Sequence, residues 1–170
     1  MKTKILIVLI ALITPLAWAE EDSAFHKFQA FLEGRTFNAR DHTTSEKVTV
    51  AKEGDSVRFR QTLVSEGTLG SATAQLTWIV AVSDLLAAHV ERQDFANGTL
   101  KISVASDLPA GAFRFEGATS FMEAAGGRSK SKPNSGRALR FGILFNDSKE
   151  ADEFLALYAG FIEDLKTKKG

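Results

Sequence analysis

The spacing of apolar residues changes twice along this chain. Near the start it follows the repeat of an amphipathic helix, through Phe25, Phe28, Phe31 and Leu32. Asp22 or Ser23 can cap the first turn of this helix, and Gly34 stands where the end of a helix favours a left-handed residue. The pattern predicts a short N-terminal helix whose apolar face packs against another element.

Between Thr36 and Asn146, apolar and polar residues alternate in short runs divided by turn residues. Alternation with a period of two is typical of strands that bury one face, so the pattern predicts a meandering antiparallel sheet. The predicted strands are residues 47–51, 56–64, 75–82, 90–96, 99–105, 112–116, 119–123 and 138–145.

The run 56–64 shows the two faces of the predicted sheet. One side carries Val57, Phe59, Gln61 and Leu63. The other side carries Arg58, Arg60 and Thr62. We therefore expect one face in the core and one in water. The run 75–82 is apolar on both sides at its end, which predicts a strand in the middle of the sheet.

Two glycines mark predicted hairpins. Gly54, within residues 52–55, can supply the positive φ of a tight turn. Asn97-Gly98 between two β-rich runs predicts a two-residue type I′ turn. Both turns lie between predicted strands in which apolar and polar residues alternate. Each turn therefore predicts a pair of neighbouring antiparallel strands.

The end of the chain predicts a strand followed by a long helix. In the strand, Leu139, Phe141, Ile143 and Phe145 are expected to face inward. Asp147 is a suitable N-cap with Glu150 three residues later, and Lys166 favours the negative end of the helix dipole. The apolar stripe of this helix consists of Ala151, Phe154, Leu155, Tyr158, Phe161, Ile162 and Leu165.

These elements predict an α+β fold. It has an antiparallel meandering sheet of about seven strands, arranged as a sandwich or a partly open barrel. A short N-terminal helix precedes the sheet, and the long amphipathic C-terminal helix covers it as a lid because its stripe is too apolar to remain in water.

Residues 1–19 have the pattern of a cleaved signal peptide. Lys2 and Lys4 precede an apolar run from Ile5 to Ile13, and small residues occupy positions −3 and −1 of a cut after Ala19. The run is shorter than the roughly 20 apolar residues that a membrane-spanning helix needs. We expect residues 20–170 to form a single globular domain in the periplasm, or alternatively in the secreted fraction, without a transmembrane segment.

Composition narrows the possible partners. Without Lys2 and Lys4 the chain has 19 basic and 21 acidic residues, a net charge of −2, which favours neither nucleic acid nor membrane. The chain has no Cys, which excludes thiol nucleophiles, thiolate metal sites and disulfides. Packing must stabilise the fold, and 13 Phe residues are available for it.

Two segments resemble the pleckstrin-homology-like architecture. Residues 79–86 (IVAVSDLL) are similar to a strand followed by Ser-Asp-Leu in small bacterial proteins of this shape. Residues 140–155 (RFGILFNDSKEADEFL) are similar to their last strand and the start of their helix. The resemblance implies a binding scaffold without a shared chemistry, and the export signal departs from the cytoplasmic lipid-binding members.

Motifs for catalysis are absent from the sequence. It contains no nucleophile elbow, phosphate-binding loop or dinucleotide-binding motif. His26, His42 and His89 lack the spacing that forms a metal site on one element. We therefore expect a protein that is not an enzyme and has no metal or cofactor.

Two features remain as possible binding sites. The basic segment 126–137 (GGRSKSKPNSGR) is expected to be an irregular loop, and its cations can engage anionic groups or simply keep the loop in water. The candidate binding residues are Arg128, Lys130, Lys132, Arg137 and Arg140. The many Phe residues can line a cavity for an acyl chain or simply fill the core.

The sequence thus favours an exported, non-enzymatic binding module of the bacterial envelope. Its expected partner is another protein or an anionic envelope component, bound through a sheet edge or a loop face, and nucleic acid is not expected. A carrier of a hydrophobic ligand and an inhibitor or immunity protein against a secreted enzyme are the alternatives.

Overall fold

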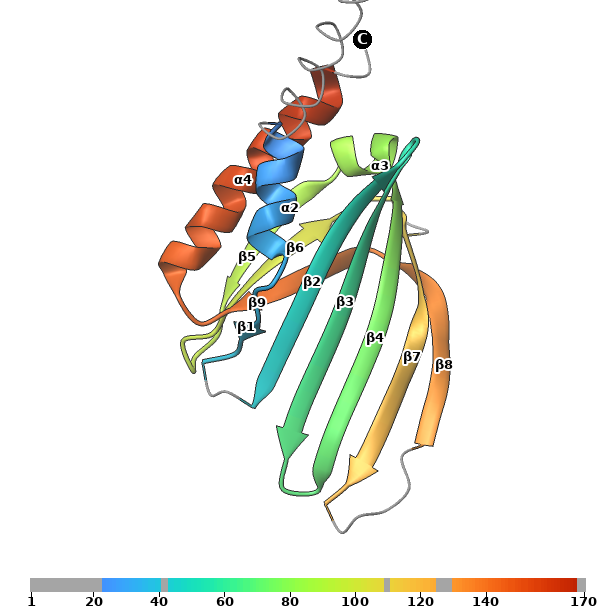
Figure 1. The fold of residues 1–170 in the computed structure, drawn as a ribbon, viewed down its shortest axis with the longest axis vertical. Coiled ribbons are helices and arrows are strands. Elements are labelled where there is room, and N and C mark those ends of the chain that lie inside the picture. The colour runs from blue at the N-terminus through green and yellow to red at the C-terminus, as the bar shows by residue number, and fades with distance from the viewer. Residues whose placement is uncertain (1–22, 41–42, 109–110, 125–129, 168–170) are drawn as a thin grey trace, which may run out of the picture.

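The computed structural model describes residues 23–40, 43–108, 111–124 and 130–167. These residues form nine strands in two antiparallel sheets, with a short N-terminal helix and a long C-terminal helix (Figure 1). The predicted α+β class is confirmed, and the larger sheet does not close into a barrel. The predicted signal peptide lies outside the described residues.

The larger sheet has six strands in the order β1-β2-β3-β4-β7-β8. Sequential strands are neighbours except where the chain leaves the sheet between β4 and β7. The strands are β1 (Phe37–Asn38), β2 (Thr44–Glu53), β3 (Ser56–Gly67), β4 (Gly70–Ala81), β7 (Phe113–Glu123) and β8 (Lys130–Ala138). The run 75–82, predicted to lie mid-sheet, belongs to β4 up to Ala81, and β4 has β3 and β7 as neighbours; Val82 begins a short helix instead.

The smaller sheet has three strands in the order β5-β6-β9. They are β5 (His89–Asp94), β6 (Leu100–Ala105) and β9 (Arg140–Phe145). The helices are α2 (Ala24–Leu32), α3 (Val82–Leu86) and α4 (Ser148–Thr167). Helices α2 and α4 lie side by side at one end of the larger sheet, and β9 crosses behind that sheet toward the start of α4 (Figure 1).

The core lies where the two sheets and the helices meet. Aromatic rings fill much of it: Phe28 stacks on Phe161 with ring centroids 5.2 Å apart, and Phe59 lies 4.7 Å from Phe141. Phe37 packs against Phe145 at 5.2 Å, which connects β1 to β9. These contacts show that Phe residues from distant parts of the chain fill a core without disulfides.

Several local predictions need correction. The predicted turn at residues 117–120 lies inside β7, which is one continuous strand from Phe113 to Glu123. The β5–β6 turn is longer than the predicted two residues, because the N–H of Gly98 donates to the carbonyl of Phe95 and the N–H of Phe95 donates to the carbonyl of Thr99. The loop consists of the three residues 96–98. Gly98 has φ +79° and is the left-handed residue that ends this loop.

The last strand also differs at its start. Phe141, Ile143 and Phe145 are buried as predicted, but Leu139 is exposed. Leu139 lies between β8 and β9, where the chain passes from one sheet to the other. The alternation that predicted its burial therefore does not continue across the change of sheet.

Candidate binding surface

Paired residues of the larger sheet form rows that point to one side of it, because direct partners in antiparallel strands share a face. One such row is Val50, Phe59, Trp78 and Phe115. Its members are buried or half-buried under β9, where Phe141 packs on both Phe59 and Trp78. We call this side of the larger sheet the inner face.

The inner face continues past the core. Two rows further along, the paired residues are Leu63, Ala74 and Thr119, and the next row contains Ser65, Ala72 and Phe121. We call these six residues the open patch. Five of them are half-buried and Phe121 is 43 % exposed. In the part of the chain that the structure describes, no helix lies over this end of β3, β4 and β7 (Figure 1).

The outer face of the same strands has a different composition. Beside the open patch it carries Lys47, Thr62, Gln75 and Thr73. Closer to the core it carries Arg58, Arg60 and Glu116. None of the six residues of the open patch is charged, whereas the outer face beside it carries Lys47 together with polar residues and the apolar Val64 and Ala118.

Further exposed apolar residues lie at the end of the sheet beyond the open patch. Leu69, in the β3–β4 turn, is 81 % exposed, and Met122, which follows Phe121 and lies on the outer face opposite Ser71, is 53 % exposed. The N–H of Ala124 donates to the carbonyl of Leu69 at 3.1 Å, which places the turn beside the end of β7. Exposed apolar groups that gather in one region mark a candidate interaction site.

Most of the predicted basic loop is a strand. Residues 130–138 form β8 at the edge of the larger sheet, because their backbone pairs with β7 from Phe113 to Phe121. Lys132 and Arg137 are exposed on β8, whereas Arg128 lies outside the described residues and only the backbone of Lys130 is described. Lys132 pairs with Thr119, so it lies in the same row as the open patch.

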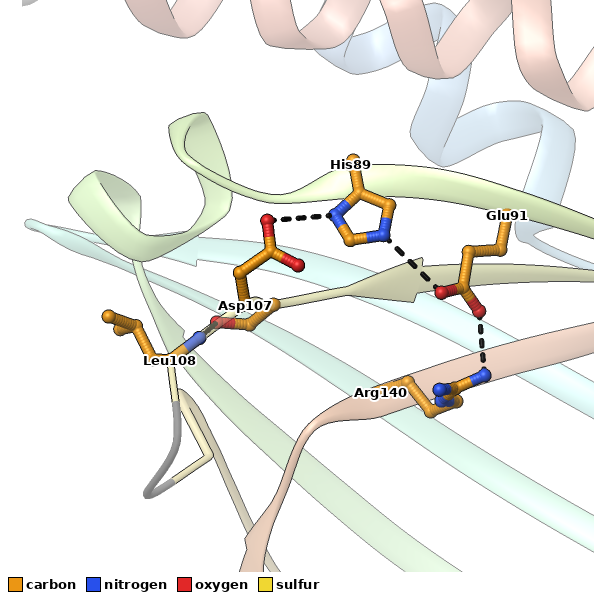
Figure 2. Close-up of polar contacts among 6 residues, drawn as sticks. His89, Glu91, Asp107, Leu108 and Arg140 are labelled. Carbon is orange, nitrogen blue, oxygen red and sulfur yellow. Dashed lines mark hydrogen bonds and ion pairs between the residues drawn. The ribbon is translucent and has the colours of Figure 1, made fainter.

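Two of the predicted binding residues lie away from this row. Arg137 is opposite Arg114, on the outer side of the sheet. Arg140 begins β9 and donates to Glu91 at 2.6 Å, as Figure 2 shows. The structure therefore places Lys132 in the row of the open patch, and it places Arg137 and Arg140 elsewhere.

Arg140 belongs to an exposed polar cluster on the smaller sheet (Figure 2). Glu91 also contacts His89, with Glu91 Oε1 3.3 Å from His89 Nε2. Asp107 Oδ2 lies 3.7 Å from the other ring nitrogen of His89. These side chains are each more than one-third exposed, so water screens their charges and the contacts stabilise little.

The remaining histidines do not join this cluster. His26 lies on α2, where its Nδ1 is 2.7 Å from the hydroxyl of Ser23, and His42 is outside the described residues. Within the described residues, no group of three His, Asp or Glu side chains is arranged to hold a metal ion. None of the described helices is long and apolar enough to cross a membrane.

A buried carboxyl group lies where β9 meets the larger sheet. The side chain of Glu46 is 1 % exposed, and its Oε2 accepts a hydrogen bond from the N–H of Leu144 at 3.2 Å. Gln61 donates to the other oxygen of Glu46 and to the carbonyl of Gly142. Trp78 Nε1 in turn donates to Gln61 Oε1 at 2.7 Å. These side chains bind backbone groups of β9 and so connect the two sheets.

The environment of Glu46 changes its acidity. Burial raises the pKa of Glu46 from 4.5 to about 7, while hydrogen bonds from Gln61 and Leu144 and the charge of Lys101 lower it by less. Lys101 reaches across β9 at Gly142, where an added Cβ would lie 2.8 Å from Lys101 Cε. The absence of a side chain at Gly142 leaves room for this approach.

Sequence reasoning missed Glu46, because the predicted strand began at Lys47. One signal was present: Gln61 is a polar residue on a side otherwise formed by Val57, Phe59 and Leu63. A buried amide needs hydrogen-bonding partners, and Glu46 supplies one of them. Nothing local in the sequence identifies which residue that partner is.

Two depressions lie away from the open patch. One, of about 280 Å³, is lined by the β2–β3 turn, the start of α3 and Leu165. The other, of about 530 Å³, is open to solvent near the start of α4 and includes Arg40 and Arg92. Arg92 is already paired with Asp94 and Asp152, so its charge is largely balanced.

Comparison of the chain with protein families, with curated proteins and with solved structures finds no match. The resemblance to the pleckstrin-homology-like architecture stays a prediction. Function must therefore be argued from the surface of the molecule.

Proposed function

We propose that this protein is an exported binding module of the bacterial envelope, without catalytic activity, and that its partner covers the open patch. One observation carries the proposal. The inner face changes from a buried core at Phe59 and Trp78 to a surface where Ala72 is half-buried and Phe121 is exposed, and the six residues of the open patch are apolar or small and uncharged.

Covering this surface is energetically favourable. Apolar surface that leaves water stabilises an association by about 25 cal/mol per Å². The strands β2, β3, β4 and β7 each have a neighbour on both sides, so their backbone groups are already paired within the sheet. A partner on the inner face therefore gains apolar contact without leaving backbone groups of this sheet unpaired.

A photo-crosslinking amino acid tests the proposal. Ala74 and Thr73 are consecutive residues of β4 that point to opposite faces of the sheet. We replace each in turn by p-benzoylphenylalanine, irradiate cells that produce the protein, and analyse the products by mass spectrometry. We expect an adduct from position 74 and little or none from position 73.

Equal adducts from both positions would show that contact at the inner face is not specific. No adduct at position 74, although the variant is folded and present in the envelope fraction, would contradict the proposal. Thermal unfolding of both variants serves as the control, because a bulky residue at either position can disturb the sheet.

A further inference from the structure

We propose that the occupant of the open patch is an acyl lipid with an anionic headgroup, whose chain lies on the patch and whose headgroup lies beside Lys132. This inference rests on the proposed binding role of the open patch and specifies its ligand. Three properties of the surface support it: its lack of charge, its width and the position of the nearest cation.

The first property is that the patch carries no charge and few polar groups. Leu63, Ala72, Ala74 and Phe121 present carbon atoms. The patch has two hydroxyls, that of Thr119 and that of Ser65, which lies 3.4 Å from the hydroxyl of Thr44. An alkyl chain has no hydrogen-bonding groups of its own. Its burial on this surface therefore leaves few polar groups without a partner, whereas a polar ligand would be left unsatisfied here.

The second property is the width of the patch. From Leu63 on β3 the row runs through Ala74 and Thr119 to Lys132 on β8, which crosses three intervals between neighbouring strands. Strands are about 4.8 Å apart, so the row is about 14 Å wide. The hydrocarbon core of a bilayer is about 30 Å thick, so one acyl chain spans about 15 Å and matches this width.

The third property is the position of charge. Lys132 is exposed at the end of the row, opposite Thr119. Glu123, the acidic residue on this side at the end of β7, lies opposite Gly70, one row beyond Phe121. Among the described side chains, Lys132 is therefore the cation nearest the middle of the patch, and it favours an anionic group at that edge.

Binding of a fluorescent fatty acid tests the inference. The probe is 11-(dansylamino)undecanoic acid, which carries a carboxylate, and its methyl ester serves as the uncharged counterpart. Fluorescence titration of the purified protein gives the Kd for each probe. We expect saturable binding of both probes, with the acid bound more tightly.

Two pairs of matched variants locate the site. Ala74→Glu introduces a charge into the patch and is expected to raise the Kd of both probes at least about tenfold. The reason is that the bound alkyl chain of the probe would remove water from this charge. Thr73→Glu adds the same charge on the outer face and is expected to leave both Kd values within about twofold. Thermal unfolding checks that both variants are folded.

Lys132→Ala tests the headgroup. It is expected to weaken binding of the acid about threefold, the usual size of one exposed ion pair, and to leave the methyl ester unchanged. Lys47→Ala removes one exposed cation from the outer face and is expected to change neither Kd. Native mass spectrometry of protein isolated from the periplasm is expected to show a bound lipid that Ala74→Glu removes.

Several results would overturn the inference. Absence of saturable binding, equal losses for Ala74→Glu and Thr73→Glu, or equal effects of Lys132→Ala on acid and ester would each contradict it. If no lipid binds but position 74 still crosslinks to an envelope protein, the lipid assignment fails and the proposed function remains. If position 74 crosslinks to nothing and no lipid binds, both fail.

Discussion

At the scale of single residues, Glu46 has the most unusual environment in the described structure. Its carboxyl group is buried, yet it accepts hydrogen bonds from Gln61 and from the backbone of Leu144. Because burial raises its pKa to about 7, the folded protein binds the proton of Glu46 more tightly than the unfolded chain, whose value is near 4.5. Folding and protonation are therefore linked.

The sign of this linkage gives a prediction. Well below pH 4.5 Glu46 is protonated in both the folded and the unfolded state, so it does not lower the free energy of unfolding. As the pH rises from 4.5 to 7 the unfolded state loses its proton first, so the free energy of unfolding decreases, by about 3 kcal/mol once the pH is above 7. Urea unfolding at intervals from pH 4 to pH 8 measures this decrease.

The variant Glu46→Gln isolates the contribution of this one group. Between pH 4.5 and pH 7 the free energy of unfolding of the wild type decreases because of Glu46. We expect the variant to lack this decrease of about 3 kcal/mol. Glu66→Gln, at an exposed position of β3, is the control and should keep the wild-type slope. A Glu46→Gln protein with the wild-type pH dependence would show that the pKa of Glu46 is nearly the same in the folded and unfolded states.

At the scale of elements, α4 is attached to the fold through its aromatic residues. Phe161 is fully buried, and its ring stacks on Phe28 of α2 and lies 5.5 Å from Phe25. Tyr158 and Phe154 extend the same contact along the helix. The two terminal helices thus depend on each other, although more than a hundred residues separate them in the sequence.

We predict that Phe161→Ala lowers the free energy of unfolding by about 3 kcal/mol, because the buried ring loses both transfer free energy and packing contacts. Glu163→Ala, at an exposed position of the same helix, should change it by less than about 0.5 kcal/mol. Chemical denaturation measures both. A Phe161→Ala protein as stable as the wild type would mean that α4 is not docked as described.

The edge strand β8 shows how a polar segment becomes part of a sheet. Its residues have low strand propensity, but each pairs with a residue of β7 from Phe113 to Phe121. Pro133 and Lys132 are typical of edge strands, because a missing N–H and a charge both hinder pairing with a second molecule. The composition that predicts a loop is thus the composition of a protected edge.

At the scale of the whole molecule, the two ends of the larger sheet have different surroundings. Helices α2 and α4 and the crossing strand β9 cover one end, whereas the inner face at the other end is accessible among the described residues (Figure 1). Export into the envelope would place this accessible end among lipids and envelope proteins. The proposed function therefore depends on the predicted signal peptide.

We predict that the protein recovered from the periplasmic fraction begins at Glu20, which intact mass measurement can establish. The substitution Ala17→Asp places a charge at position −3 of the predicted cut and should leave the uncleaved precursor at the membrane. Ser23→Asp, beyond the cut, is the control and should be processed normally. Recovery of the full-length chain in the cytoplasm alone would contradict the export prediction.

The sequence by itself determined the features that depend on local repeats. The two-residue alternation in 56–64 correctly put Phe59 on the inner face and Arg60 on the outer face, and the repeat after Asp147 correctly predicted α4. The α+β class follows from these repeats, because the period of a pattern is a property of the backbone geometry of each element.

Only the tertiary structure decided what covers each surface. Gly117 reads as a turn residue, but in β7 it allows close approach to the carbonyl of Gln75, where a Cβ would overlap. The carboxyl group of Glu46 accepts a hydrogen bond from Leu144, nearly a hundred residues away, and the helices leave one end of β3, β4 and β7 uncovered (Figure 1). Local patterns set the direction of a side chain, whereas its burial depends on elements that fold onto it from elsewhere in the chain.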